Sequence, residues 1–320
     1  MLTIPKIFGR KSKEKDFLVL EIGLEKISCA IFEKEEETIK LKGVGRKKFS
    51  SQEEVFDSCL ESLDALAAIV PDFPTRGILG ISGGSLETVT TIAHYTRPQP
   101  KTAINAKETE DVLEQVVANL DTTKKKIFFS SIAGAELDNV KVSNPLGLKG
   151  EKIELPCFAA FKDLDEMELL DRIVNEIDLK VEKIVPTSFA VAKLLESRNF
   201  KNALLFRCGL EKSEITAIVD THVSEILPVD LGFQEPEFLT FAFTAALKGI
   251  EKEKRPALIW LFSDSDEVDL EKLKETLLAF PWSLQFGFEV APKIEVAEAI
   301  HNFSPSDIGI YALSQQEENQ

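Results

Sequence analysis

Two stretches of the chain share one pattern, FLVLEIGLEKISCAIFE (17–33) and ALLFRCGLEKSEITAIVD (203–220). Each reads as an apolar strand, a turn that contains glycine and a second apolar strand, so each predicts a buried β-hairpin. Both turns contain Gly-Leu-Glu-Lys, at 23–26 and at 209–212. A duplication over this distance predicts two lobes that open with the same hairpin.

The residues that follow each hairpin support this division. After the first come a strand-like IKLKGVGRKKF (39–49) and a helical stretch at 52–70 that ends before two prolines. After the second come a strand-like VSEILPVDLG (223–232), a helical stretch and a buried strand within PALIWLFSD (256–264). Two lobes whose hairpin turns face one another are typical of actin-like ATPases. We therefore predict an α/β, actin-like (ribonuclease H-like) two-lobed fold.

A further block interrupts the first lobe. Residues 84–161 contain two strand-like stretches at 85–96 and 153–161 and a helical one at Thr109–Leu120, which indicates an inserted α+β subdomain. An amphipathic helix at 167–179 follows it. The predicted division is a basic leader at 1–15, a first lobe at 16–83 and 162–200, the inserted subdomain at 84–161, a second lobe at 201–313, and a polar tail at 314–320 that we expect to be frayed.

Composition limits the classes of function. The 320 residues carry 54 acidic and 38 basic side chains, a formal net charge of −16, so general binding of nucleic acid is not expected. No stretch reaches the roughly 18 to 20 apolar residues that a membrane-spanning helix needs, and the N-terminus lacks a secretory apolar region. We expect a cytoplasmic protein.

Cysteine and histidine positions give no sign of a metal or redox site. No Cys-x-x-Cys spacing occurs, and we expect the four cysteines to be buried free thiols in a reducing compartment. The three histidines, His94, His222 and His301, are far apart in the sequence, so we expect no metal site built from them.

Several segments resemble FtsA, the actin-like protein of bacterial cell division. The most specific are GISGGSLETV (80–89) and NPLGLKGEKIEL (144–155), and the resemblance extends over about 16–313. It implies cell-division partners in the divisome, binding to the tail of the tubulin-like FtsZ, and homo-oligomers in which copies associate head to tail into open filaments. The alternatives are a component like PilM of type IV pilus assembly, which binds a short peptide from a membrane partner, and a true actin-like ATPase.

The phosphate loops of the family are altered in this chain. The usual first loop is Asp-Ile-Gly-Thr, and here it reads Glu21-Ile22-Gly23-Leu24. The usual second loop is Asp-Ile-Gly-Gly-Gly-Thr-Thr-Asp, and here it reads RCGLEKSE (207–214). The resemblance assigns nucleotide contact, if any remains, to Glu21, Gly23, Lys26, Arg207, Gly209 and Ser213.

These changes predict a pseudo-ATPase without catalytic residues. Arg207 reverses the charge of a metal-organising aspartate, while Leu210 and Glu211 place side chains where glycines let phosphate approach. Asp264 and Asp266 add negative charge after the central strand of the second lobe. We expect no cofactor, and ATP with magnesium is the disfavoured alternative, in which Arg207 would contact a phosphate directly. The sequence leaves open whether the chain is an enzyme.

The basic leader is the one candidate for membrane contact. Its apolar and basic residues form the mixture that an interfacial anchor uses on anionic lipid at the inner face of the cell membrane. The alternative is a disordered basic leader. The residues concerned are Leu2, Ile4, Lys6, Ile7, Phe8, Arg10 and Lys11.

Overall fold

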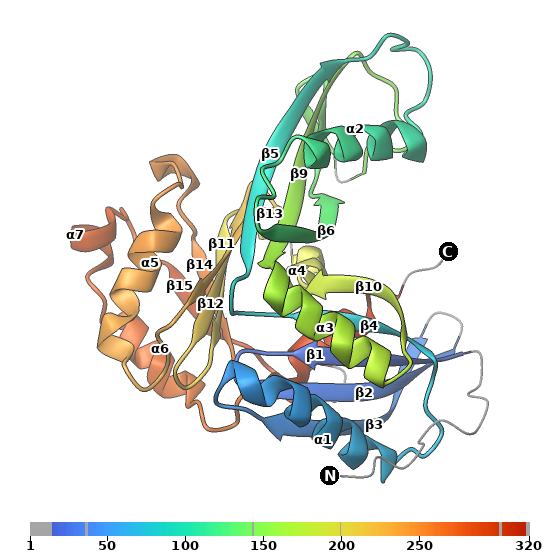
Figure 1. Cartoon of the computed structure of the whole chain (residues 1–320). Coiled ribbons are helices and arrows are strands. Elements are labelled where there is room, and N and C mark those ends of the chain that lie inside the picture. The colour runs from blue at the N-terminus through green and yellow to red at the C-terminus, as the bar shows by residue number, and fades with distance from the viewer. Residues whose placement is uncertain (1–14, 36–37, 143, 199, 301–302, 318–320) are drawn as a thin grey trace.

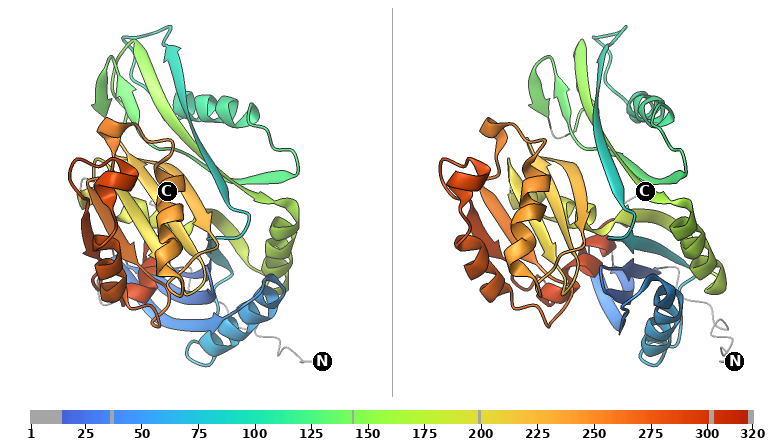
Figure 2. Two further views of the ribbon diagram at one scale, coloured as in Figure 1. Left: turned by 90° about the vertical axis from the view of Figure 1, so that its left-hand side faces the viewer. Right: turned by 60° about the vertical axis from the view of Figure 1, so that its left-hand side comes forward.

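A computed structural model describes residues 15–35, 38–142, 144–198, 200–300 and 303–317 of the chain. The leader residues proposed for membrane contact, Leu2 to Lys11, lie outside these ranges. The described part contains three five-stranded sheets, one for each lobe and one for the inserted subdomain. Figures 1 and 2 show the inserted subdomain, in green, projecting from the two lobes.

The sheet of the first lobe has the strand order β10-β4-β1-β2-β3. Strand β2 runs antiparallel to both β1 and β3. In contrast, β4 runs parallel to β1, and β10 runs parallel to β4. Two helices, α1 and α3, cover its outer face. The bounds are β1 (Asp16–Ile22), β2 (Lys26–Glu35), β3 (Thr38–Lys48), α1 (Val55–Ala67), β4 (Arg76–Ile81), α3 (Leu164–Glu176) and β10 (Lys180–Pro186).

The sheet of the second lobe repeats this arrangement with the order β13-β12-β11-β14-β15. Its hairpins are again antiparallel, and β11, β14 and β15 are again parallel. The shared topology confirms the predicted duplication and the actin-like fold class. The bounds are β11 (Ala203–Cys208), β12 (Ser213–Val219), β13 (His222–Val229), α5 (Leu239–Leu247), β14 (Leu258–Phe262), α6 (Leu270–Leu278), α7 (Trp282–Phe286) and β15 (Lys293–Val296).

Apolar side chains bury both faces of each lobe sheet. On β1, Leu18 and Leu20 pack toward the outer helices, while Phe17 and Val19 pack into a core shared by the two lobes. Two helices lie in that shared core, α4 (Thr187–Leu194) and α8 (Ile308–Ser314). Burial on both faces is why these strands read as nearly continuous apolar runs.

The inserted subdomain lies between β4 and α3 in the sequence. In its sheet β5 pairs with β9, and β9 pairs with both β6 and β7. Helix α2 packs on this sheet. It begins at Ala106, three residues earlier than predicted, because the Asn105 side chain caps its N-terminus. The bounds are β5 (Glu87–Thr96), α2 (Ala106–Ala118), β6 (Lys125–Ile132), β7 (Ala135–Leu137), β8 (Val140–Val142) and β9 (Lys152–Asp163).

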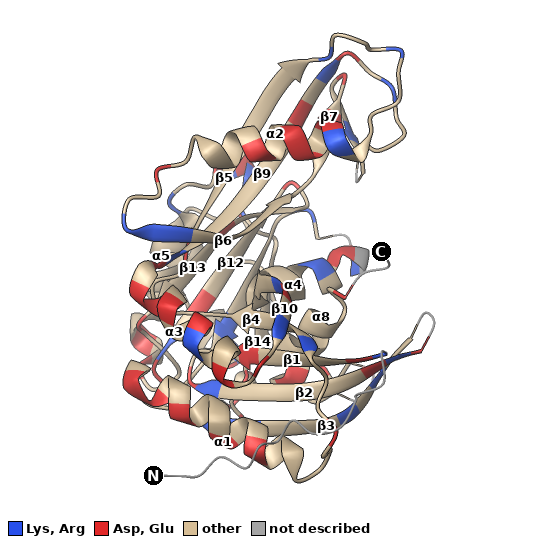
Figure 3. Ribbon diagram, turned by 45° about the vertical axis from the view of Figure 1, so that its right-hand side comes forward, with Lys and Arg blue, Asp and Glu red and all other residues tan. Residues whose placement is uncertain are grey.

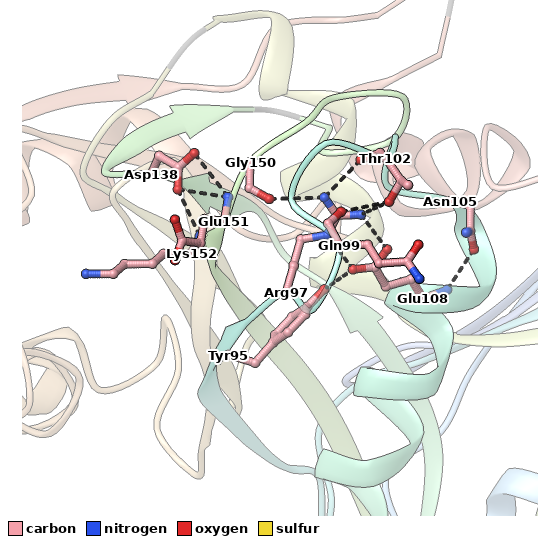
Figure 4. A network of polar contacts seen from close by, with 10 residues as sticks. All are labelled: Tyr95, Arg97, Gln99, Thr102, Asn105, Glu108, Asp138, Gly150, Glu151 and Lys152. Atoms are coloured by element: carbon pink, nitrogen blue, oxygen red, sulfur yellow. Dashed lines mark hydrogen bonds and ion pairs between the residues drawn. The ribbon is translucent and has the colours of Figure 1, made fainter.

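A buried arginine fastens the end of this subdomain that is far from the lobes (Figure 4). Arg97 donates to both carboxylate oxygens of Glu108, at 2.6 and 2.9 Å, and to the main-chain oxygens of Thr102 and Gly150, at 3.0 and 3.1 Å. Tyr95 donates to the same carboxylate at 3.1 Å. The Arg97 guanidinium therefore links α2 to the loop after β5 and to the loop before β9, which together form the tip of the subdomain.

Threonine side chains connect the inserted subdomain to the second lobe. Thr88 Oγ1 accepts a hydrogen bond from the backbone N–H of Ile226 at 2.8 Å, and Thr90 Oγ1 donates to the carbonyl of Ser224 at 2.8 Å. These contacts join β5 to β13 along the sides of two edge strands.

The surface and the cysteines follow the expectations from composition. Figure 3 shows acidic residues along α1 and α2. All four cysteines are free and buried, as predicted, and burial raises the pKa of Cys29 and Cys157 to about 11. Among the described residues, no helix is long and apolar enough to span a membrane.

The start of the polar tail is held in place, so the expectation of fraying is wrong for its described part. Ser314 is buried in α8, and Glu317 forms an ion pair with Arg76 at 2.8 Å. Lys183 donates to the carbonyl of Gln316 at 3.0 Å. Basic side chains of the first lobe neutralise this acidic segment, a contact that local composition does not reveal.

Candidate functional site

The two duplicated turns meet where the lobes join. In the β1–β2 turn the N–H of Gly23 donates to the carbonyl of Lys26 at 2.9 Å, and in the β11–β12 turn Gly209 donates to Lys212 at 2.7 Å. A Cβ on Gly23 would lie 2.5 Å from Asp264 Oδ2, so glycine is required for this approach. We call the polar groups around both turns the interlobe site: Glu21, Glu25, Ser82, Arg207, Glu214, Asp264 and the backbone of 210–212.

Arg207 lies at the centre of the interlobe site and is 1% exposed. Its Nη2 donates to Glu21 Oε1 at 2.7 Å and to Asp264 Oδ2 at 2.8 Å, and its Nη1 donates to Ser82 Oγ at 2.5 Å. Asp264 comes from the end of β14 in the same lobe, whereas Glu21 and Ser82 belong to the first lobe. The guanidinium thus crosses from one lobe to the other.

The two carboxyl groups that Arg207 contacts differ in the direction of their pKa shifts. Burial raises the pKa of Glu21, and Arg207 offsets this only in part. At Asp264 burial acts in the same direction, but the positive charges of Arg207 and Lys26 outweigh it and hold the pKa below its ordinary value. Arg207 and Lys26 thus lower the pKa of Asp264, whereas the pKa of Glu21 stays above its ordinary value.

Glu25 makes the reciprocal crossing, from the first lobe into the second. Its carboxylate accepts hydrogen bonds from three consecutive backbone N–H groups, those of Leu210 at 2.8 Å, Glu211 at 2.6 Å and Lys212 at 3.0 Å. Successive N–H groups that point at one anion form a nest, the arrangement that phosphate loops use. In this chain a side-chain carboxylate fills the nest.

The buried carboxylate of Glu214 contacts the Gly-Ile-Ser-Gly-Gly segment. Glu214 is fully buried on β12, accepts a hydrogen bond from Ser188 Oγ, and accepts another from the N–H of Gly83 at 3.0 Å. Gly83 and Gly84 both have φ near +59°, which favours glycine. Ser82 in the same segment contacts Arg207, so this turn of the first lobe fits closely onto the second lobe.

The structure brings together most of the site residues chosen from sequence. Glu21, Gly23, Arg207 and Gly209 lie at the lobe junction, and Lys26 Nζ donates to the carbonyl of Ser306 at 3.2 Å. Ser213 lies apart from the network, because its hydroxyl is buried against Cys208 Sγ at 3.6 Å.

One expectation about the second loop is wrong. The sequence pointed to Glu211 as the carboxylate that intrudes at the phosphate position, but Glu211 is exposed and contributes only its N–H. The carboxylate that contacts the backbone of 210–212 belongs to Glu25, which sequence reasoning missed. The signal available was its place in the duplicated Gly-Leu-Glu-Lys, where it reads as an ordinary turn residue.

The polar contacts at the two loops differ from those that the resemblance implies for a magnesium nucleotide. A buried guanidinium stands where the resemblance places a metal-organising aspartate, and it is bonded to both nearby carboxylates. The N–H groups that would meet a phosphate are taken by Glu25. No grouping of three or more potential metal-ligating side chains occurs within the described ranges.

A groove of about 950 Å³ lies at some distance from the interlobe site, between the inserted subdomain and the first lobe. Residues Phe128–Ser131 of β6 form one wall and Val181–Val185 of β10 form the other. Within the described chain β6 pairs only with β9 and β10 pairs only with β4, so both are edge strands of their sheets. Edge strands can bind an extended peptide through main-chain hydrogen bonds.

Comparison with known proteins places the chain by fold alone. No model of a protein family matches the sequence, and neither does any curated protein. Among solved structures, the PilM-PilN type IV pilus biogenesis complex is similar with a TM-score of 0.61 and 11% identity, covering 94% of this chain and 98% of that one. A protein of unknown function with an actin-like ATPase fold from Bacteroides thetaiotaomicron has a TM-score of 0.52 and 10% identity, covering 94% and 96%.

Proposed function

We propose that this chain is a non-catalytic, actin-like component of a multiprotein assembly, which binds a protein partner and turns over no nucleotide. The observation that carries the proposal is the interlobe site. There Arg207 stands at the position that the resemblance gives to a metal-organising aspartate, and Glu25 accepts hydrogen bonds from the N–H groups of the second loop. The solved structure with a TM-score of 0.61 is that of a pilus biogenesis complex. We therefore favour an assembly of the PilM type.

Nucleotides are expected to leave the thermal stability of the protein unchanged. A ligand that binds only the folded state at 100 times its Kd adds about 2.7 kcal/mol to the free energy of unfolding, which differential scanning fluorimetry readily detects. We expect no shift in Tm with millimolar ATP, ADP or GTP, with or without magnesium, and no phosphate release above a protein-free control. A saturable rise in Tm with ATP would overturn the proposal.

The groove between β6 and β10 is the proposed binding site for an extended segment of the partner. Tryptophan at Ser130 or at Ser131 is expected to fill it, and testing both residues covers both faces of the strand. We expect at least a tenfold loss of affinity for a labelled peptide from the cytoplasmic part of the organism's pilus membrane partner, measured by fluorescence anisotropy.

The matched control for this experiment is Lys126→Trp, on the same strand but outside the groove, where the side chain is exposed. The control is expected to bind the peptide like the unmodified protein. Unchanged binding by both serine variants, with circular dichroism showing that they fold, would place the peptide site elsewhere.

The second candidate is an FtsA-like scaffold of cell division, which the Asn144-Pro145-Leu146-Gly147 segment favours. The same segment also has a local explanation. Asn144 Oδ1 accepts from the N–H of Leu146 at 2.9 Å, and Gly147 has φ +80°, so these residue types suit a tight turn in any protein. A labelled peptide of the FtsZ tail in the anisotropy assay would support the division role if it bound and the pilus peptide did not.

A further inference from the structure

We propose that the chain carries its own ligand for an oxyanion site: the nest formed by residues 210–212 is preorganised, Glu25 occupies it, and inorganic phosphate or a small carboxylate can replace that side chain. The inference rests on the proposed function, because the Glu25 carboxylate would explain how the lobes close without a nucleotide. It extends that function by identifying a built-in anion that closes the two lobes on one another.

The geometry around Glu25 is that of a built anion site. Three consecutive N–H groups lie 2.6 to 3.0 Å from its two carboxylate oxygens, with Leu210 donating to Oε2 and Glu211 and Lys212 to Oε1. Gly209 permits this approach, because a Cβ there would lie 2.9 Å from Oε2. Charge-assisted bonds of this length are stronger than those between neutral groups.

The nest is held by its own lobe and does not depend on Glu25 for its shape. The Gly209 N–H donates to the carbonyl of Lys212, and the N–H groups of Phe233 and Gln234 donate to the carbonyls of Gly209 and Leu210, both at 2.9 Å. Gly232 packs so closely on Leu210 that a Cβ would lie 2.4 Å from the Leu210 oxygen. Removal of the Glu25 side chain should therefore leave the N–H groups pointing at an open space.

The two lobes exchange opposite charges across their junction. Glu25 of the first lobe enters the second, while Arg207 of the second lobe enters the first and meets Glu21. In the duplicated Gly-Leu-Glu-Lys, Glu211 is the counterpart of Glu25 but is exposed. Only one of two equivalent glutamates is thus a ligand, which provides a control at the matched position.

The test compares full-length Glu25→Ala with full-length Glu211→Ala, by scanning fluorimetry in sodium phosphate and in sodium chloride of equal ionic strength. Glu25→Ala is expected to melt several degrees lower than the unmodified protein and to regain most of that loss in phosphate, with a saturable dependence. Sodium acetate, which replaces the missing carboxylate directly, is expected to do the same. Glu211→Ala and the unmodified protein are expected to show no gain over chloride.

A Glu25→Ala protein that melts lower but responds equally to phosphate, acetate and chloride would overturn the inference, and so would an equal gain in Glu211→Ala. If Glu25→Ala does not fold, Glu25→Gln keeps one acceptor oxygen and should show a smaller loss and a smaller phosphate gain. The outcome is separable from the proposed function, which fails only if the unmodified protein binds nucleotide or if its partner site lies elsewhere.

Discussion

Arg207→Ala is expected to lower the free energy of unfolding by about 3–5 kcal/mol at pH 7, because it leaves two carboxylates buried without their cation. Glu21 is 2% exposed and Asp264 is 5% exposed, so water cannot replace the guanidinium without opening the lobe junction. The loss should appear as a lower midpoint in urea. Lys48→Ala, which removes an exposed ion pair with Glu267, serves as the control and should change the midpoint little.

The destabilisation by Arg207→Ala is expected to shrink on acidification. In the unmodified protein Arg207 holds the pKa of Asp264 below its ordinary value and limits the rise at Glu21. Without Arg207, burial raises the pKa of both carboxyls above their unfolded values of about 4. A raised carboxyl pKa costs stability as the pH rises through that range, so the variant should lie closer to the unmodified protein at pH 4 than at pH 7.

A combined variant separates the charge from the packing. With Glu21→Gln and Asp264→Asn added to Arg207→Met, the two carboxylates that Arg207 contacts no longer carry charge, and we expect the triple variant to be more stable than Arg207→Ala. Equal stability of the two variants, or an Arg207→Ala protein whose midpoint differs from the unmodified one by the same amount at both pH values, would contradict this account of the junction.

Arg97→Ala is expected to loosen the tip of the inserted subdomain and to cost about 2–4 kcal/mol locally. The variant removes the Arg97 donors from the main-chain carbonyls of Thr102 and Gly150 and from the Glu108 carboxylate (Figure 4). Amide hydrogen exchange should rise at 98–105 and 144–151 and should stay unchanged in the two lobe sheets. Arg97→Lys keeps the charge but not the forked donors, so it should restore only part of the protection.

The same contact predicts a pH dependence of the tip. The hydrogen bond from Arg97 holds the pKa of Glu108 below its ordinary value, although burial acts against it. A lowered carboxyl pKa contributes stability above the unfolded value and loses it as the pH falls through the folded value. The protection of the tip amides, corrected for the intrinsic pH dependence of exchange, should therefore fall as the pH is lowered through the folded pKa of Glu108, and Arg97→Ala should show no such step.

The sequence by itself determined the two duplicated hairpins, the inserted subdomain and the burial of the cysteines. These follow from local apolar runs and from the turn residues between them, because a strand buried on both faces must be apolar wherever it lies. The sequence also showed where the chain departs from the phosphate loops of the family it resembles, because Arg207 stands at an acidic position of that pattern and Leu210 and Glu211 stand at glycine positions.

Only the tertiary structure decided what those altered loops do. Arg207 meets Asp264 across 57 positions and Glu21 across 186, and Glu25 meets Leu210 across 185. The pattern of apolar residues fixes which face of a strand is buried, but it carries no information about which charged side chain of one lobe reaches the other. Glu25 and Glu211 occupy the same place in the duplicated turn. They differ because the Glu25 side chain contacts the opposite loop, whereas the Glu211 side chain is exposed.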